Sequence, residues 1–421
     1  MVPGILPSIV SSDADCADTT ASPELSRRQL TQLAIGGALA MTVSAMPSRS
    51  TAQTRQAQGE QTMSEGSASY VYVGARTTKE RNARGDGLNV YRMDNATGAW
   101  THLQLLDDLV NPSFLAFDRS RRFLYTVHGD LSDITAMAID AGSGRLRVIN
   151  RRSTDGKNPV HLAVDPSNRY VVVANHITSS LALLPRQEDG ALGAVIDLVK
   201  LEGKIGPHRV EQPFAKPHQV EFDPSGTFIV VPDKGLDLVF TYRIDAEKGK
   251  LVLASKPVQA REGAGPRHIA FHPTGKLAYV VNELDSTVTA YRFDPASGAL
   301  SPFQVVSAVP DSFTGNSRAA EIAVSADGRY VYASNRGNDS LAIYAIDAAS
   351  GRLAPRGWTP SGGKTPRFFA LGASDRFLFA ANEDSDMVTM FTRAPDGLLA
   401  ATGNVVKVGS PVCILFRESQ A

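Results

Sequence analysis

The stretch GPRHIAFHPTGKLAYVVNE, residues 265–283, carries ionisable side chains where two short apolar strands begin and end. Arg267 and His268 come just before an apolar run, and Glu283 directly follows the next one. A guanidinium, an imidazole and a carboxylate could together move a proton, bind an anion and stabilise a developing negative charge. These residue types therefore predict acid–base chemistry on an anionic small molecule, provided that the fold brings them together.

The composition of the 421-residue chain favours a globular protein that binds a small molecule. Basic and acidic residues are equal in number, 43 each, and 43% of the residues are hydrophobic, so the chain can bury a large core. The sequence has no Lys/Arg run and no interleaving of aromatic and basic residues, the pattern that binds a nucleic-acid backbone. We therefore expect a small-molecule partner and no nucleic acid, and the oligomeric state stays open.

The N-terminal region has the pattern of an export signal. The sequence SRRQL at residues 26–30 precedes a short, weakly apolar run, and small residues then offer a cleavage point before Gln53. This pattern predicts a twin-arginine signal peptide over residues 1–52, a disordered linker over residues 53–69 and a periplasmic mature protein that is not stably inserted in a membrane. Initiation at Met63 is the alternative, and it would leave the protein in the cytoplasm.

Past Tyr70 the chain repeats one unit: an apolar strand, a turn of the Asp-Pro-Ser-Gly type, a second apolar strand, a polar turn and an alternating strand. The strand pair recurs six times, as LAFDRSRRFLYTVHG, LAVDPSNRYVVVANH, VEFDPSGTFIVVPDK, IAFHPTGKLAYVVNE, IAVSADGRYVYASNR and FALGASDRFLFAANE. YVYVGAR at Tyr70 is a second strand without a first, and SPVCILF at Ser410 is a first strand without a second. Together they make a seventh unit. The pattern predicts an all-β, seven-bladed β-propeller over residues 70–417, its ring closed by the C-terminal strand in the N-terminal blade.

Equivalent positions of such repeats form rings around the propeller axis. The second strands are followed by mostly ionisable residues, namely Arg76, Gly129, His176, Lys234, Glu283, Arg336 and Glu383. The first strands, which line the central channel, start at Ser113, Val160, His218, Arg267, Ala320, Arg367 and Val412. An antiparallel pair places the start of one strand beside the end of the next, so we expect the two sets to meet at one mouth of the channel.

Five ionisable residues of these rings concentrate on consecutive blades, which favours a site over a solvated ring of salt bridges. Purely structural charges would follow the repeat around the whole ring, whereas small or apolar residues occupy most equivalent positions elsewhere. The five residues are His218, Arg267, Glu283, Arg336 and Arg367. Long insertions at residues 198–216 and 309–318 interrupt the same part of the repeat, and loops of that length usually line a functional face.

Several motifs resemble those of the propeller lactonases related to 6-phosphogluconolactonase, a family that includes the carboxy-cis,cis-muconate lactonising enzyme. The similarity runs from Tyr70 to Phe416, and its motifs are Pro-His-Gln at Pro217, Val-Pro-Asp-x-Gly at Val231, Gly-Pro-Arg-His at Gly265, Asn-Glu at Asn282 and Ser-Asn-Arg at Ser334. The resemblance implies active-site roles for His218, Glu283, Arg267 and Arg336. The chain departs from the family pattern at Lys216-Pro217-His218, where related sequences often have a histidine before the proline.

These residue types suit lactone hydrolysis without a metal or another cofactor. His218 and Glu283 can share the proton transfers, and arginine can bind a phosphate or carboxylate through two parallel hydrogen bonds and stabilise the oxyanion. Further substrate contacts are expected from neighbouring ring positions, namely His268, Lys234, Arg367, Asn282, Asn335 and Glu383. The sequence lacks the motifs of a serine nucleophile, a zinc site and a phosphate-binding loop.

Three functional hypotheses stay open at this point. The first is a lactonase for a sugar-acid lactone, and the second is a cycloisomerase that uses the same groups on a muconate. The third is an exported propeller that binds a ligand or protein without catalysis, because a fold does not determine a function. The residues alone do not identify the lactone or organic acid.

Overall fold

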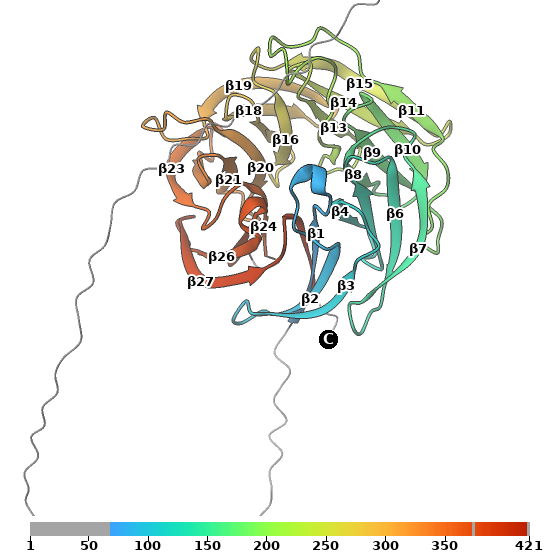
Figure 1. Cartoon of the computed structure of the whole chain (residues 1–421). Helices are drawn as coiled ribbons and strands as arrows, with labels where there is room; N and C mark the ends of the chain where they lie inside the picture. The colour runs from blue at the N-terminus through green and yellow to red at the C-terminus, as the bar shows by residue number, and fades with distance from the viewer. Residues whose placement is uncertain (1–67, 373–374, 419–421) are drawn as a thin grey trace, which may run out of the picture. The chain divides into compact units, whose positions relative to one another are not determined.

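The computed structural model describes residues 68–418 apart from 373–374, and these residues form seven four-stranded sheets. The sheets are arranged as blades around one axis (Figure 1), which confirms the expected all-β, seven-bladed propeller. Among the described residues, no helix is long and apolar enough to cross a membrane. The expected signal peptide, residues 1–52, and residues 53–67 of the expected linker lie outside the described part of the chain.

Each blade is built from four consecutive antiparallel strands, except that the first blade combines both ends of the described chain. The first blade contains β28 (Pro411–Glu418), β1 (Ala68–Ala75), β2 (Leu88–Asp94) and β3 (Trp100–Leu106). The second blade contains β4 (Pro112–Phe117), β5 (Phe123–His128), β6 (Asp133–Ile139) and β7 (Leu146–Ser153). The third contains β8 (Pro159–Val164), β9 (Tyr170–Asn175), β10 (Ser180–Pro185) and β11 (Asp197–Lys200). The fourth contains β12 (Glu221–Phe222), β13 (Ile229–Asp233), β14 (Leu238–Asp245) and β15 (Lys250–Gln259). The fifth blade contains β16 (Pro266–Phe271), β17 (Leu277–Asn282), β18 (Thr287–Asp294) and β19 (Ala299–Ser307). The sixth contains β20 (Arg318–Val324), β21 (Tyr330–Arg336), β22 (Ser340–Ile346) and β23 (Leu353–Pro360). The seventh contains β24 (Pro366–Leu371), β25 (Phe377–Asn382), β26 (Met387–Arg393) and β27 (Leu399–Lys407).

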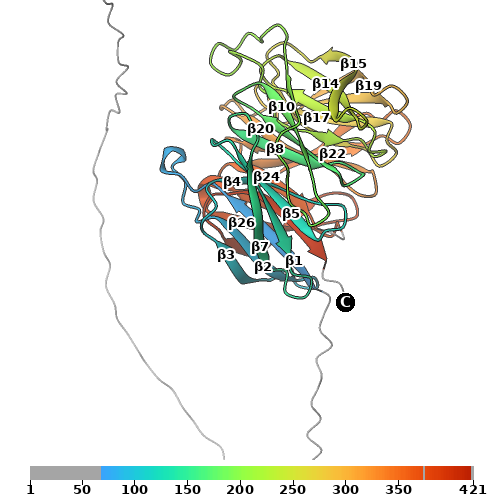
Figure 2. The same ribbon diagram turned by 90° about the vertical axis from the view of Figure 1, so that its right-hand side faces the viewer.

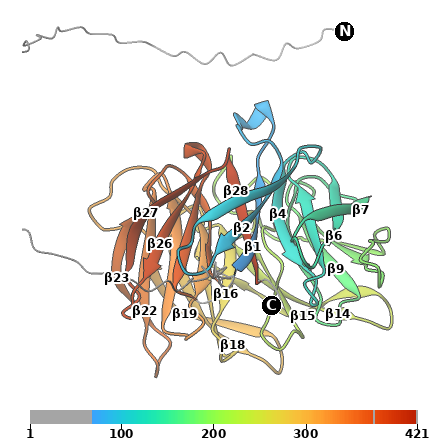
Figure 3. The ribbon, with the colours of Figure 1, turned by 90° about the horizontal axis from the view of Figure 1, so that it is seen from below.

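The ring closes through the pairing of β28 with β1, as the two unmatched repeat halves predict. The strands run antiparallel, with Tyr72 opposite Leu415 and Val73 opposite Ile414, and Figure 3 labels both strands in the first blade. β1 begins at Ala68, two residues before the expected start of the propeller. This pairing gives β1 an inner neighbour and completes the four-stranded first blade.

The turn between the first and second strand explains why the repeat is visible in the sequence. In three blades this turn begins with an aspartate, Asp118, Asp165 or Asp223, whose carboxylate accepts backbone N–H groups two to five residues further on. These bonds satisfy donors that a tight turn would otherwise leave unpaired. The motif therefore recurs because it fixes the same strand-to-strand turn.

The core of the propeller lies between the blades. Among the described residues, seven clusters of buried apolar side chains occur, one at each interface between neighbouring blades, and Figure 2 shows the sheets packed face to face. A buried tyrosine of the second strand also donates to a glycine carbonyl of the following blade, as in Tyr72 to Gly144 and Tyr279 to Gly351. This packing holds the inner strands, and therefore the channel, in a defined geometry.

Candidate active site

The start of each inner strand meets the end of its neighbour at one mouth of the channel. In the fifth blade, Pro266 of β16 pairs with Asn282 of β17, and the register shifts by one residue before His268 pairs with Val281. Equivalent shifts occur in the second, third and seventh blades. A bulge of this kind re-aims a side chain. As a result Arg267 and His268 both border the narrow part of the channel.

A cavity of about 280 Å³ opens at this mouth, a size near the lower end of small-ligand pockets. Two histidines, His176 and His218, and two carboxylates, Glu211 and Glu283, line it. The cationic side chains that line it are more numerous, namely Arg76, Arg81, Lys216, Lys234, Arg318, Arg336 and Arg367. The balance of charge in the cavity suits an anionic ligand.

Glu283 holds four of the basic side chains together. Its Oε1 lies 3.1 Å from Lys234 Nζ and 3.7 Å from Arg318, and its Oε2 lies 3.2 Å from both Arg267 Nε and Arg336. Burial alone would raise the pKa of Glu283, but the charges of Arg336, Lys234 and Arg267 outweigh burial and keep the pKa well below its usual value. The carboxylate is therefore a fixed anion at neutral pH.

Two residues of the long insertions complete this charge cluster, and motif reasoning missed them. Glu211 lies 3.0 Å from Lys234 Nζ and 2.6 Å from Arg318. Burial acts to raise the pKa of Glu211, whereas Lys234 and Arg318 lower it, and the result is a pKa of about 2. Glu211 belongs to the insertion at residues 198–216, and Arg318 ends the one at residues 309–318. The length of the insertions indicated a functional face. Because the other repeats have no corresponding loop, aligning the repeats could not identify Glu211 and Arg318.

A second group forms a chain of hydrogen bonds from the cavity into the channel. His218 Nδ1 lies 3.1 Å from His268 Nε2, and His268 Nδ1 lies 3.0 Å from Glu321 Oε1. The three residues are 5%, 2% and 6% exposed. His268 therefore connects His218, which lines the cavity, with a carboxyl group deeper in the channel. Glu321 was visible in the alignment of inner-strand starts, but its contact with the neighbouring blade was not.

The imidazole of His218 is held in its neutral form. Burial lowers the pKa of His218 well below its ordinary value, and the nearby charge of Arg267 acts in the same direction. The ring is therefore neutral near neutral pH. Its Nδ1 is occupied by His268, so the opposite nitrogen, Nε2, is the atom left for a ligand. His176 packs against His218 with the ring centroids 5.2 Å apart.

Arg367 and Arg76 extend the basic lining across the channel. Both side chains border the narrow part of the channel as well as the cavity. Arg76 lies 3.5 Å from Asp130, and burial together with the charge of Arg367 lowers its pKa to about 10. Glu383 begins η2 (Glu383–Ser385), and its carboxylate is 4.0 Å from Arg367 Nε. Glu383 thus contacts a cavity residue without lining the cavity itself.

Asn282 and Asn335 lie elsewhere than the sequence predicted. The Asn282 amide donates to Thr287 and Thr289 at 2.9 Å, and the Asn335 amide donates to the Ala308 carbonyl at 2.6 Å. Consecutive side chains of a strand point to opposite faces, so the residue before Glu283 cannot share its direction. Asn282 therefore ties strands within its blade, Asn335 binds the segment that follows β19 of the preceding blade, and neither lines the cavity.

The other expected residues come together at one mouth. His218, Lys234, Glu283, Arg336 and Arg367 line the cavity. Arg267 and His268 border the narrow channel directly beneath it. Within residues 68–418, excluding 373–374, no group of three or more His, Cys, Asp or Glu side chains is arranged to hold a metal ion.

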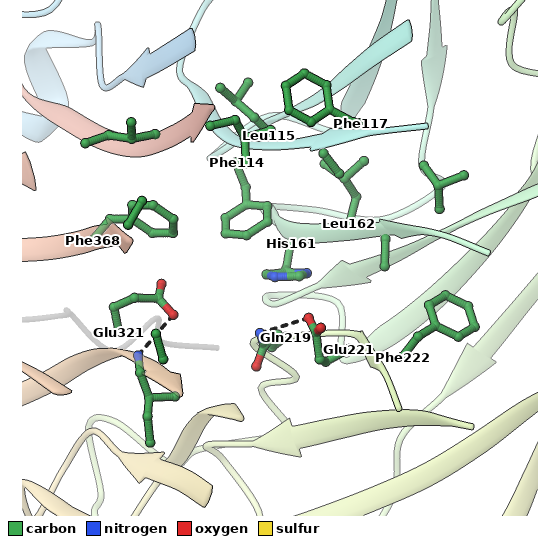
Figure 4. A pocket seen from close by; sticks show the side chains of 18 of the residues that line it. Phe114, Leu115, Phe117, His161, Leu162, Gln219, Glu221, Phe222, Glu321 and Phe368 are labelled. Atoms are coloured by element: carbon green, nitrogen blue, oxygen red, sulfur yellow. Dashed lines mark hydrogen bonds between the residues drawn. The ribbon is translucent and has the colours of Figure 1, made fainter. Parts of the chain in front are cut away.

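The opposite mouth of the channel has a different character. A cavity of about 600 Å³ is lined there by residues further along the same inner strands. Figure 4 shows its aromatic rings, among them Phe114 and Phe368, together with His161, Glu221 and Glu321. Burial and the proximity of Glu321 raise the pKa of Glu221 to about 8. Glu321 borders both this cavity and the narrow part of the channel.

Known proteins resemble this chain over nearly the whole propeller. The chain is 36% identical to a 6-phosphogluconolactonase of Bacillus subtilis (strain 168), over 82% of this chain and 97% of that protein. It is 31% identical to a 6-phosphogluconolactonase of Formosa agariphila, over 77% of this chain and 92% of that protein. The solved structure of a periplasmic gluconolactonase of Pseudomonas aeruginosa superimposes with a TM-score of 0.78 and 31% identity, covering 84% of this chain and 100% of that one.

The family assignment rests on the same part of the chain. The family described as lactonase, 7-bladed beta-propeller, matches residues 70–416, the range over which the motifs recur. This match and the relatives above confirm the resemblance that the sequence motifs predicted. The chain therefore belongs to the seven-bladed β-propeller lactonases, the enzyme class expected from its residues.

Proposed function

We propose that this protein hydrolyses the lactone of a sugar acid that carries a phosphate or carboxylate, without a metal ion. The observation that carries this proposal is that a buried, neutral imidazole, His218, shares one cavity with seven cationic side chains. A neutral imidazole can remove a proton from water, and guanidinium groups bind anionic oxygens through paired hydrogen bonds. The relatives named 6-phosphogluconolactonase and gluconolactonase support a sugar-acid lactone as the substrate class.

In the proposed reaction His218 acts first as base and then as acid. Its Nε2 takes a proton from water while the water oxygen bonds to the lactone carbonyl carbon. The bond from that carbon to the ring oxygen then breaks, and His218 returns the proton to the ring oxygen, which leaves a hydroxy acid. Arg267 borders the same neck of the channel as His218 and stabilises the oxyanion, and Arg336 and Arg367 bind the anionic substituent.

Glu283 has a different role in this proposal from the one first expected. The sequence-based hypothesis gave it a share of the proton transfers. Both oxygens of Glu283 are paired, Oε1 with Lys234 and Oε2 with Arg267 and Arg336, so its carboxylate is not free to take a proton from water. We assign to Glu283 the task of holding these cations in position for the substrate.

The proposal is tested with the purified chain and a panel of three compounds: 6-phosphogluconolactone, gluconolactone and a carboxymuconate. We expect the phosphorylated lactone to be opened fastest, at a rate on the order of a hundredfold above that of the His218→Ala variant. Prior treatment with a chelator should leave the rate unchanged. Equal rates for wild type and variant with both lactones would overturn the proposal. Turnover of the muconate alone would favour the cycloisomerase, and binding without turnover would favour the non-catalytic propeller.

For cellular location, the proposal is export to the periplasm through the twin-arginine pattern at residues 26–30. One structural relative is itself a periplasmic gluconolactonase. Replacing Arg27 and Arg28 by Lys should keep the protein in the cytoplasm, and the exported wild type should begin near Gln53. A wild-type protein found wholly in the cytosol with Met63 at its terminus would contradict export.

A further inference from the structure

The hydrogen-bond chain from His218 through His268 ends at a carboxyl group that borders two different parts of the channel. Glu321 lies in the narrow section beneath the basic cavity and also lines the larger cavity at the opposite mouth (Figure 4). Its Oε1 is 3.0 Å and its Oε2 is 3.1 Å from His268 Nδ1. The chain therefore links the reactive imidazole of the fourth blade with a titratable group on the sixth blade.

The protonation state of one end of this chain determines the other end. An ionised carboxylate only accepts hydrogen bonds, so it requires a proton on His268 Nδ1. In neutral His268 the Nε2 atom is then an acceptor, and it requires a proton on Nδ1 of His218. Neutral His218, which lines the basic cavity, then carries a free lone pair on Nε2.

A protonated carboxyl group has a donor of its own and can therefore reverse every bond of the chain. It donates to His268 Nδ1, so His268 carries its proton on Nε2 and donates to His218 Nδ1. Neutral His218 then has its proton on Nε2 and cannot accept one from water. One proton at Glu321 therefore exchanges the donor and acceptor nitrogens of the His218 imidazole, to which Glu321 is linked through His268.

We propose that Glu321 is a positioning residue that sets the tautomer of His218 through His268, and that only the ionised form of Glu321 leaves His218 able to act as a base. This inference rests on the role of His218 in the proposed function. Glu321 touches no substrate in it, because His268 separates it from the basic cavity.

The surroundings of Glu321 place its titration in an accessible pH range. The ionisable groups near it come from the other inner strands and their first residues, namely Arg267 and His268 on β16, Arg367 on β24, Glu221 on β12, His161 on β8 and Cys413 on β28. Burial raises the pKa of Glu321 to about 8, although Arg267 and Arg367 favour the charged form, and on its own strand the Ile322 amide donates to Oε1.

The direction of the pH dependence follows from this shift. As the pH rises through the pKa of Glu321, the carboxyl group loses its proton and Nε2 of His218 becomes an acceptor. Activity should therefore rise with pH. Below the pKa of Glu321 the rate should increase about tenfold for each pH unit, and above that pKa it should level off. The rate measured with the His218→Ala variant at each pH gives the background of spontaneous lactone hydrolysis, which is subtracted from the wild-type rate.

The deciding experiment follows the tautomer of His218 directly, on the full chain labelled with ¹⁵N-histidine. The His218 signals are assigned by their loss in His218→Ala. In the wild type between pH 6 and pH 9, Nε2 should change from an N–H to a bare ring nitrogen. In Glu321→Gln the tautomer should no longer depend on pH, and the alkaline rise in kcat should disappear while KM stays within about twofold.

Glu221→Gln is the matched control, because Glu221 lines the same cavity without belonging to the hydrogen-bond chain. This variant should keep the alkaline rise but shift it to lower pH, since it removes a like charge near Glu321. A control that loses the rise altogether would contradict the assignment to Glu321.

Two results would overturn the inference: a wild-type His218 tautomer that stays the same from pH 6 to pH 9, or an unchanged alkaline rise in Glu321→Gln. If Glu321→Gln does not fold, the wild-type titration decides alone. Failure of the proposed function is distinguishable, since a protein that hydrolyses no lactone still reports the tautomer. Lactone hydrolysis with a pH-independent tautomer would sink this inference and leave the proposed function standing.

Discussion

Lys234 Nζ lies 3.1 Å from Glu283 Oε1, and the two residues follow the second strands of neighbouring blades. The pair is buried, and Glu283 also contacts Arg267 and Arg336. Three consecutive blades therefore contribute to this cluster: Lys234 comes from the fourth, Arg267 and Glu283 from the fifth, and Arg336 from the sixth. The distances within this cluster depend on how neighbouring blades pack, so a change in the cluster should affect both the stability of the ring and the site.

Replacing Glu283 by Gln should destabilise the protein by about 3 kcal/mol, because it leaves buried cations without their shared anion. The KM for an anionic lactone should rise as well, since the cations repel one another and shift. Denaturant unfolding and steady-state kinetics measure the two effects. Glu262→Gln is the control: its partner Lys204 is 3.9 Å away and both side chains are exposed, so its effect should stay below about 1 kcal/mol. Equal effects of the two substitutions would contradict the cluster's role.

Replacing His218 by Ala should lower kcat on the order of a hundredfold and change KM much less, because the imidazole acts on water rather than on the bound anion. His102 on β3 is a suitable control, since it is hydrogen-bonded to Asn89 away from the channel. His102→Gln should retain wild-type kinetics. A His218→Ala enzyme with full kcat would remove His218 from the reaction.

Replacing Arg336 by Lys should mainly raise KM for a phosphorylated lactone, since lysine keeps the charge but loses the planar pair of donors. The increase should be smaller for an unphosphorylated lactone, and the ratio of the two KM values is the measurement. Arg329→Lys, with an exposed side chain that pairs with Asp327, serves as the control. An equal change for both lactones would show that Arg336 does not bind the anionic substituent.

Glu221 should make the protein less stable as the pH rises. Its pKa is raised from 4.5 to about 8 by burial and by Glu321, so folding favours its protonated form. That contribution is fully present below about pH 4.5 and is lost as the pH rises toward 8. Glu221→Gln should therefore melt like the wild type at pH 4 and at a higher temperature at pH 8.5. An exposed control, Glu247→Gln, should show no such divergence. Parallel melting curves of Glu221→Gln and wild type at both pH values would refute this.

Deleting residues 410–421 should sharply lower stability, because it removes β28 and opens the first blade. Thermal unfolding measures the effect. Deleting residues 419–421 alone is the control, since β28 ends at Glu418 and keeps every pair with β1. If the longer deletion melted at the wild-type temperature, ring closure would not contribute to stability.

Most of the fold was predictable because its defining features are local. A carboxylate such as Asp118 satisfies its own turn, so the turn motif marks each strand pair in the sequence. Antiparallel pairing then places the start of β16 beside the end of β17, which is why Arg267 and Glu283 could be assigned to one mouth. Neither step needs knowledge of distances across the ring.

The parts that the sequence did not reveal depend on side-chain contacts between blades or on strand faces. Glu211 reaches Lys234 from a loop without a repeat equivalent, so no alignment of blades could place it. The contact between His268 and Glu321 joins the inner strands of two neighbouring blades, β16 and β20. Asn282 was misplaced because a position next to Glu283 in sequence points to the other side of its strand.

The pairing of β1 with β28 also determines the order in which the protein can be completed during synthesis. β1 emerges from the ribosome early, whereas its inner partner is the last strand of the described chain. Until β28 has been synthesised, the first blade has an unpaired strand edge that can pair with another chain. Any export route that accepts only folded cargo therefore has to wait until this strand has been made and has paired with β1.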